Sequence, residues 1–378
     1  MSKERILITG GAGFVGSHLA DALLQAGHDV VVYDNLEPQV HGEAETLDRP
    51  AYLHPDIPLL RGDVRNAEQL EGPVRRSDVV VHLAAMVGVG QSMYQIHRYT
   101  DVNTMGAATL LQLLAEDRGK VRKLVVASSM SIYGEGAYHC PACGPVAPRL
   151  RAEPQLMERH WETLCPSCGA ELQPRATSED KPLFPSSIYA INKRDHEEMF
   201  LAFGTAYRLP VVALRFFNIY GSRQALSNPY TGAAAIFCSR MMSGHPPLIY
   251  EDGRQLRDFV HVSDVVQACC LAIQRVEADG QVLNVGSGRA LSINEVSAIL
   301  AKELGWRGGA EIAGRYRAGD IRHCYADISR IQRLLGYKPL IQLERGVHEL
   351  VQWVARQSEI RDGVVAATAE LAARGLVR

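Results

Sequence analysis

Residues 8–35 read ITGGAGFVGSHLADALLQAGHDVVVYDN and place a glycine-rich turn between a strand pattern and a helix pattern. Gly10 suits a tight turn, and Gly13 suits close approach of the backbone to a pyrophosphate. Gly16 suits close packing of the helix on the sheet. A strand, a turn and a helix in this order predict a dinucleotide site with its pyrophosphate at the helix N-terminus.

A carboxylate at the end of the second predicted strand indicates which dinucleotide binds. Asp34 can accept hydrogen bonds from both ribose hydroxyls and repels a 2′-phosphate, so we expect NAD rather than NADP. The alternative interpretation of this motif is a glycine turn with a surface aspartate. For Asp63, Val64 and residues 83–85, which follow other predicted strands, the alternative is an ordinary strand end. We expect the cofactor site to include Phe14, Val15, Asn35, Asp63, Val64, Leu83, Ala84, Ala85, Asn103, Ser128 and Phe216 as well.

The chain alternates short apolar runs with helical patterns, which is typical of a parallel sheet covered by helices on both faces. We therefore predict an α/β fold: a Rossmann-type doubly wound parallel sheet, a smaller C-terminal substrate domain and an inserted zinc ribbon. The expected NAD domain spans 1–210 with an insert at 135–176, the substrate domain mainly 211–358 and partly interleaved, and a C-terminal helix 359–378. Strands are predicted at 5–9, 30–34, 59–63, 78–84, 123–129, 211–217 and 282–286, and helices at 17–26, 102–116, 232–243 and 293–304.

Composition excludes several classes of partner. Of 378 residues, 47% are hydrophobic and 22% charged, and the formal net charge is −2. This balance gives no electrostatic reason to expect nucleic acid or an acidic membrane surface as a partner. Because we find no apolar signal core and no apolar run of spanning length, we expect a cytoplasmic enzyme without membrane association.

Two segments predict a proton-transfer site. SSMSIYG (128–134) ends a predicted strand, and SIYAINK (187–193) places Tyr189 and Lys193 four residues apart, on one face of a helix. A free tyrosine has a pKa of about 10, and a nearby ammonium group lowers it. By itself this spacing usually forms a solvated helix face. The interpretation as a proton-transfer site therefore depends on the glycine turn and on the serine at the strand end.

These motifs resemble the extended short-chain dehydrogenase/reductases. LRFFNIYGSRQALSNPYTGAAAIF (214–237), GRQLRDFVHVSDV (253–265) and RAGDIRHCYADIS (317–329) narrow the resemblance to nucleotide-sugar epimerases such as UDP-galactose 4-epimerase. It covers residues 4 to about 355, except for the insert. The loop 84–99, the SSMSIYGEG segment and the cysteine insert further resemble one subgroup, the dTDP-L-rhamnose 4-epimerases.

The resemblance implies a role for each matching position. Tyr189 is the expected proton-shuttling base, Lys193 the ligand of the nicotinamide ribose, and Ser129 the catalytic hydroxyl. For Arg257 and Arg317, which the resemblance places at the substrate diphosphate, the alternative interpretation is a surface salt bridge. The resemblance also implies a homodimer in which helices 102–116 and 189–207 pair across a two-fold axis. Expected substrate contacts are Ser129, Ser131, Asn218, Arg257, Arg317 and Asp320.

Departures from the family pattern narrow the reaction. Related 4,6-dehydratases carry an Asp-Glu pair where this chain has Met130 and Ser131, and decarboxylating relatives carry a glutamate in this segment. Asn192 replaces a small residue, which we take as tolerated. Removal and return of the same hydride at C4, which is epimerisation, is the expected reaction. A uronic acid decarboxylase, a 4-ketoreductase and a non-catalytic binding module remain as alternatives.

A second motif interrupts the first half of the chain. Cys140 and Cys143 form one C-x-x-C pair, Cys165 and Cys168 form another, and glycine follows each pair where a positive φ helps the turn. This pattern predicts a tetrahedral metal site with a structural role. We expect zinc, although iron takes the same ligands and redox-active disulfides are the second interpretation. The segment has few apolar residues of its own: Leu150, Leu156, Met157, Trp161 and Leu164.

Overall fold

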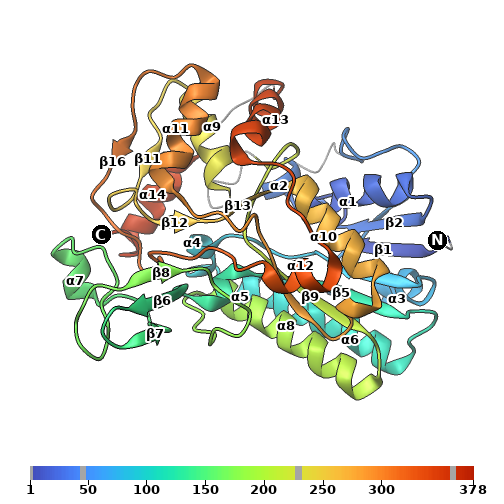
Figure 1. Ribbon diagram of the computed structural model, residues 1–378. Helices are drawn as coiled ribbons and strands as arrows, with labels where there is room; N and C mark the ends of the chain where they lie inside the picture. Colours follow the sequence, from blue (N-terminus) through green and yellow to red (C-terminus); the bar gives the residue numbers. More distant parts are fainter. Residues whose placement is uncertain (1–2, 43–47, 226–231, 358–362) are drawn as a thin grey trace.

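A large sheet with helices on both faces forms the body of the protein, and two smaller parts stand at one end of it (Figure 1). The computed structural model describes residues 3–42, 48–225, 232–357 and 363–378. A smaller helical domain occupies the upper left of Figure 1, and the cysteine insert lies below it beside the C-terminus.

The large sheet has seven parallel strands in the order β14-β9-β5-β4-β1-β2-β3. This confirms the predicted Rossmann-like parallel sheet. Because β2 and β3 lie on one side of β1 and the next strand, β4, lies on its other side, the order of the strands reverses here and the carboxyl ends of β1 and β4 open a crevice. The strands are β1 (Arg5–Thr9), β2 (Asp29–Asp34), β3 (Leu59–Arg61), β4 (Val79–His82), β5 (Lys123–Ser129), β9 (Val211–Phe216) and β14 (Val282–Val285).

Successive side chains along each strand point to opposite faces of the sheet, so the apolar core has two layers. Ile6 and Ile8 of β1 point into one apolar cluster, and Leu7 points into another. Complete burial of each such side chain stabilises the fold by about 1.5–3 kcal/mol. The first layer contains α1 (Phe14–Gln25), α10 (Val262–Gln274) and α12 (Ser329–Leu335), and the second contains α3 (Ala67–Arg75), α6 (Gly106–Glu116) and α8 (Ile188–Tyr207).

Two helix starts differ from the prediction. Helix α1 begins at Phe14, three residues before the predicted start at Ser17, and Phe14, Val15 and Gly16 of this first turn line the cleft. The predicted helix 102–116 has a π-helical turn, η2 (Asp101–Met105), before α6 begins at Gly106. Short helices α2 (Pro38–His41), α4 (Val89–Ser92), α5 (Ile96–Thr100), η3 (Met130–Tyr133) and η4 (Val276–Ala278) complete this part.

The smaller domain has its own apolar cluster between α9 (Ala233–Met242), α11 (Ile293–Leu304) and α13 (Leu343–Ala355). Since β9 and β14 belong to the large sheet, the second half of the chain contributes to both cores. Residues 226–231 of the motif 214–237 lie outside the described residues, as do residues 359–362 of the expected C-terminal helix. Its described part is α14 (Val364–Ala373). Two-stranded ladders join β10 (Asn218–Tyr220) to β13 (Phe259–His261), β11 (Leu248–Ile249) to β16 (Glu311–Ile312), and β12 (Leu256–Arg257) to β15 (Leu291–Ser292).

The cysteine insert forms a three-stranded antiparallel sheet of β6 (Ala137–Cys140), β7 (Gly144–Val146) and β8 (Gln173–Arg175). The short helix α7 (Glu153–Met157) lies between β7 and β8 along the chain. Its buried apolar cluster consists of Tyr138, Cys140, Cys165 and Leu172. The expected core was partly wrong: Leu150, Met157 and Leu164 are exposed. The insert therefore has an even smaller apolar core than the sequence indicated.

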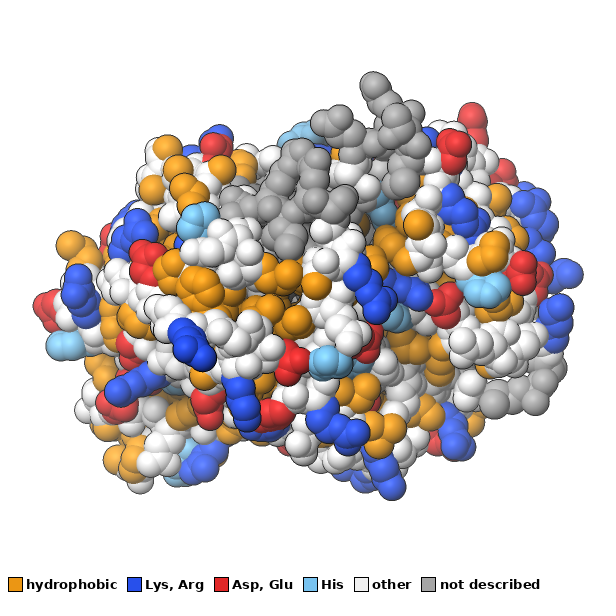
Figure 2. Space-filling view, turned by 90° about the horizontal axis from the view of Figure 1, so that it is seen from above, with side chains coloured by type: hydrophobic (Ala, Val, Ile, Leu, Met, Phe, Trp, Pro, Cys, Tyr) orange, Lys and Arg blue, Asp and Glu red, His pale blue; other side chains and the backbone are white. Residues whose placement is uncertain are grey.

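The outer surface is mixed in charge. On the face shown in Figure 2, acidic and basic side chains are scattered among apolar ones in the part of the chain that the structure describes. This distribution agrees with the small net charge. No described helix combines the length and the apolar character that a membrane span requires.

Candidate active site

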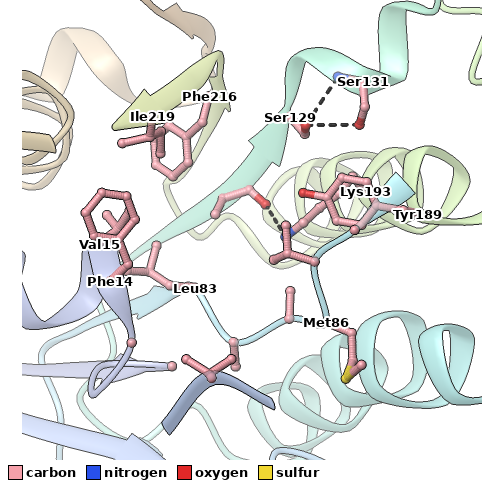
Figure 3. Close-up of a pocket in the computed structure, with 18 of the residues that line it drawn as sticks. Phe14, Val15, Leu83, Met86, Ser129, Ser131, Tyr189, Lys193, Phe216 and Ile219 are labelled. Atoms are coloured by element: carbon pink, nitrogen blue, oxygen red, sulfur yellow. Dashed lines mark hydrogen bonds between the residues drawn. The ribbon is translucent and has the colours of Figure 1, made fainter. Parts of the chain in front are cut away.

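One cleft of about 570 Å³ lies where the glycine turn, the carboxyl ends of the strands, the start of α8 and the smaller domain meet (Figure 3). Most of the predicted site residues lie together here. Those that line it are Gly10, Gly13, Phe14, Val15, Gly16, Asp34, Asn35, Asp63, Val64, Leu83, Ala84, Ala85, Ser128, Ser129, Ser131, Tyr189, Lys193, Phe216, Asn218, Arg257 and Asp320.

Close packing explains the glycines of the turn. Gly10 has φ +68°, and a Cβ there would lie 2.6 Å from the backbone nitrogen of Ala84. A Cβ on Gly16 would lie 2.4 Å from the carbonyl oxygen of Gly10. Gly13 is the N-cap of α1, and a Cβ there would meet only the Gly10 oxygen, at 3.2 Å. The turn thus brings open backbone at a helix N-terminus to the cleft, as a pyrophosphate requires.

Asp34 is fixed by the backbone around the turn. Its carboxylate accepts hydrogen bonds from the backbone nitrogens of Ala12, at 3.0 Å, and Leu36, at 2.9 Å. Burial raises the pKa of Asp34, and these bonds and the neighbouring His41 oppose that rise. The carboxylate is therefore held in one position at the end of β2, facing the cleft.

The predicted proton-transfer residues face one another across the carboxyl end of β5 (Figure 3). Tyr189 and Lys193 lie on one face of α8, whose N-terminus is capped by the Ser187 side chain. Tyr189 and Ser129 both line the cleft, and Lys193 Nζ donates to the carbonyl oxygen of Ala127 at 3.0 Å. Residues distant in sequence are thus brought together in one cleft.

Burial dominates the acidities of this group. It raises the pKa of Tyr189 to about 12, while the nearby Ser129 side chain opposes that rise. It lowers the pKa of Lys193 to about 7, because the ammonium form loses hydration. The expectation that Lys193 lowers the pKa of Tyr189 is therefore not met in the protein alone, where burial is the largest influence and Lys193 is not among the groups that lower this pKa.

Two predicted site residues lie outside the cleft lining. Asn103 is completely buried and bonds both the backbone nitrogen of Met86, at 2.7 Å, and its carbonyl oxygen, at 3.1 Å. It holds the loop after β4 in place. Arg317 places its guanidinium 4.3 Å from the ring centre of Tyr250 and its Nε 3.2 Å from the carboxylate of Asp320. For Arg317 the salt-bridge alternative agrees with the structure.

Arg257 differs from Arg317 in its contacts. Its guanidinium donates to the carbonyl oxygens of Leu256, Ile321 and Arg322 at 2.7–2.9 Å. Within the described part of the chain, no carboxylate forms an ion pair with it. Because carbonyl groups leave its charge uncompensated, Arg257 brings positive charge to the cleft lining, which suits a diphosphate.

Sequence reasoning missed a buried pair behind the catalytic residues. Glu197 accepts hydrogen bonds from Ser128 Oγ at 2.7 Å and from Arg215 Nε at 2.9 Å. Its spacing was the available signal, since Glu197 follows Lys193 by four residues on the same helix. The pair fixes α8 against the end of β5, and so fixes Lys193 relative to the cleft.

The four predicted metal ligands also come together, outside the cleft lining. Their sulfur atoms lie within 4.8 Å of one another, and those of Cys140 and Cys168 are 3.5 Å apart. A zinc ion bound to four sulfurs at about 2.3 Å would place them about 3.8 Å apart, so the donor set fits. Gly144 and Gly169 have φ of +84° and +75°, which confirms the positive φ predicted after each pair.

Comparison with known proteins places this geometry in context. The model of the "NAD dependent epimerase/dehydratase family" matches residues 6–149 and 165–286. A dTDP-L-rhamnose 4-epimerase of Burkholderia thailandensis is 34% identical over 360 residues, which cover 94% of this chain and 96% of the relative. The unmatched residues 150–164 lie in the insert, between its two cysteine pairs.

Solved structures agree with these matches. The crystal structure of UDP-glucose 4-epimerase from Thermotoga maritima with UDP-glucose superposes with a TM-score of 0.76 at 28% identity, over 94% of this chain and 100% of that one. UDP-glucuronic acid 4-epimerase from Bacillus cereus, in complex with UDP-glucuronic acid and NAD, gives 0.74 at 27% identity, over 93% and 99%.

Proposed function

Because the chain belongs to the NAD dependent epimerase/dehydratase family, we propose that it is a nucleotide-sugar 4-epimerase that uses NAD. One observation carries this proposal: Ser129, Tyr189 and Lys193 meet in the same cleft as the glycine turn. The complete catalytic group also argues against a non-catalytic binding module.

The residues of the cleft fit NAD. The backbone at Gly13 is open to a pyrophosphate, Asp34 is held where ribose hydroxyls are expected, and Lys193 lies beside the end of β5. When bound there, NAD supplies the hydride acceptor for C4 of the sugar. The chain itself supplies position and proton transfer.

Tyr189 performs the proton transfer. In its phenolate form, which a nearby ammonium group of Lys193 would favour, Tyr189 would accept the proton of the 4-hydroxyl group, and Ser129 would donate a hydrogen bond to the sugar O4. Rotation of the 4-keto sugar within the cleft would present its other face to the cofactor, and Tyr189 would give the proton back to the sugar O4. Substrate and product are isomers, so the cycle needs no external reductant.

The sugar that we propose is dTDP-L-rhamnose or a closely similar 6-deoxy sugar. Met86 and Val89 pack in one apolar group with Tyr189 and line the cleft, and such a surface suits the methyl group of a 6-deoxy sugar. The name of the Burkholderia relative gives independent support. An NMR screen of UDP- and dTDP-sugars without added reductant tests the proposal, since a reductase would be inactive and a decarboxylase would release carbon dioxide.

The segment after Ser129 favours epimerisation over elimination or decarboxylation. Met130 is buried in η3, and Ser131 Oγ donates to Ser129 Oγ at 2.9 Å. Residues 130–133 therefore carry no carboxylate that could remove a proton from C5 or assist loss of a carboxyl group.

The cysteine site is proposed to hold one structural zinc ion. Four thiolate ligands leave no open coordination position, and the donor set suits zinc. Its ligands belong to the two turns at the ends of the 144–165 loop, so the ion would join the ends of that loop.

We also expect a homodimer. Met105 and Ile191 expose 53% and 43% of their surface on the neighbouring helices η2 and α8, which Thr104 and Asp195 link by a hydrogen bond. A second copy of this face would cover these apolar side chains. Light scattering at micromolar concentration should show a dimer, and Ile191→Glu should shift it towards monomer. The matched change Val276→Glu, on η4, should not; a monomeric wild type would contradict the proposal.

A further inference from the structure

One wall of the cleft is held in place by the cysteine insert. Gly319, Asp320 and Ile321 line the cleft, and the carbonyl oxygen of Asp320 accepts a hydrogen bond from Arg151 Nη2 at 3.2 Å. Arg151 belongs to the loop that joins the two cysteine pairs. Contact between this loop and the cleft wall is therefore direct.

Arg151 is anchored on both sides of that contact. Its two terminal nitrogens bind both carboxylate oxygens of Glu251, at 2.8 and 3.0 Å, and Nη1 also donates to the carbonyl oxygen of Trp161 at 2.9 Å. Its side chain is 1% exposed. A paired, planar guanidinium of this kind has little freedom, so it fixes the position of the Asp320 carbonyl group.

Glu135, at the start of the insert, holds the next two residues of the wall. Its carboxylate accepts hydrogen bonds from the backbone nitrogens of Arg322, at 2.8 and 3.0 Å, and of His323, at 3.3 Å. Arg151 Nε lies 3.7 Å from the same carboxylate and balances its charge. Since the backbone nitrogen of Gly136 also donates to the carbonyl oxygen of His323 at 2.8 Å, the insert binds this segment through the carbonyl groups of Asp320 and His323 and the amide groups of Arg322 and His323.

The Arg322 side chain, which belongs to the wall segment, also bonds the insert. It is fully buried and donates both to Glu162 of the insert and to Asp252 of the smaller domain. On the cleft side, the carbonyl oxygens of Ile321 and Arg322 accept hydrogen bonds from Arg257. A shift of the wall would therefore move Arg257, which we expect to bind the diphosphate.

We propose that Arg151 is a positioning residue for the nucleotide-sugar site, acting through residues 320–322 and Arg257. This inference rests on the proposed function and assigns the insert a part in substrate binding. Arg151 and Glu162 fall within residues 150–164, the stretch that the family model leaves unmatched. The insert therefore supplies a support for the substrate site from a stretch that lies outside the family pattern.

Arg151→Lys is the variant that tests this role. Lysine keeps the charge beside Glu251 and Glu135, so the buried carboxylates remain compensated, but a single ammonium group cannot bind Glu251, the Trp161 carbonyl and the Asp320 carbonyl together. The matched control is Arg175→Lys, on β8 of the same insert, where the exposed side chain donates a hydrogen bond to Gln173.

We expect Arg151→Lys to raise KM for the nucleotide sugar about tenfold or more while kcat stays within about twofold, because binding is lost equally in ground state and transition state. In hydrogen–deuterium exchange, peptides that contain Arg322 and His323 should exchange faster, while bound NAD is retained. Arg175→Lys should match the wild type in every measurement.

Other outcomes separate this inference from the proposed function. An unchanged KM in a wild-type enzyme that epimerises its sugar would overturn the role of Arg151 alone. Loss of NAD together with faster exchange throughout the chain would show a general structural role and would also overturn it. If the wild type epimerises no nucleotide sugar, the proposed function fails. Binding of dTDP or UDP by wild type and variant then tests the role of Arg151, and equal affinities would overturn it.

Discussion

Tyr189→Phe is expected to lower kcat by about 10²–10⁴-fold while the protein stays folded and keeps its NAD. The change removes one hydroxyl group and leaves the ring in its apolar contacts with Met86 and Val89. Phenylalanine has no hydroxyl group, so it cannot accept the proton of the sugar at this position of the cleft.

The control for this substitution lies at the other end of the same helix. Tyr207 on α8 is half-exposed and stacks on Phe203, so Tyr207→Phe should leave kcat unchanged. Steady-state kinetics and the NAD content of purified protein provide both readouts. Near-normal turnover by Tyr189→Phe would show that the catalytic base is a different residue.

Replacing Cys165 and Cys168 together by serine should remove the metal and unfold the insert. Four buried residues make up the apolar cluster of the insert, too few to fold it unaided, whereas zinc binding supplies about 10–16 kcal/mol in small zinc-dependent peptides. Metal analysis of the wild type should give about one zinc per chain and no visible iron absorption. Cys270→Ala, at a half-buried cysteine of α10, should keep the metal.

Loss of the metal should also weaken substrate binding without releasing NAD. The loop that carries Arg151 and Glu162 is tied at both ends to the cysteine turns, whereas the glycine turn makes its contacts within the large domain. We expect KM for the sugar to rise and limited proteolysis to cut within 144–165. A metal-free wild type with full activity would contradict the structural role.

The cofactor half of the site was predictable because its signals are local. The glycine turn, Asp34 and the residues after the strands are placed by the repeating order of strand and helix, and they occur together in the cleft. Side-chain orientation was not predictable in the same way. Asn103 turns its amide group to the Met86 backbone, since a buried loop after β4 needs its polar groups satisfied.

The part that escaped prediction depends on contacts between distant segments. Arg322 meets Glu162 although 160 residues separate them, and Arg151 meets Asp320 across 169 residues. Helical and strand periodicity report only near neighbours, so no spacing in the sequence connects these residues. The structure identifies the side chains that join the insert to the wall of the cleft.

The central claim is that one hydride leaves and returns to C4 of the same sugar. The most direct measurement is proton NMR of dTDP-L-rhamnose with the purified enzyme in deuterium oxide, without added NAD or reductant. We expect the C4 epimer to accumulate to an equilibrium mixture, with the C4 proton fully retained in both sugars. Deuterium at C4, or conversion only after reduced nicotinamide cofactor is added, would contradict this account.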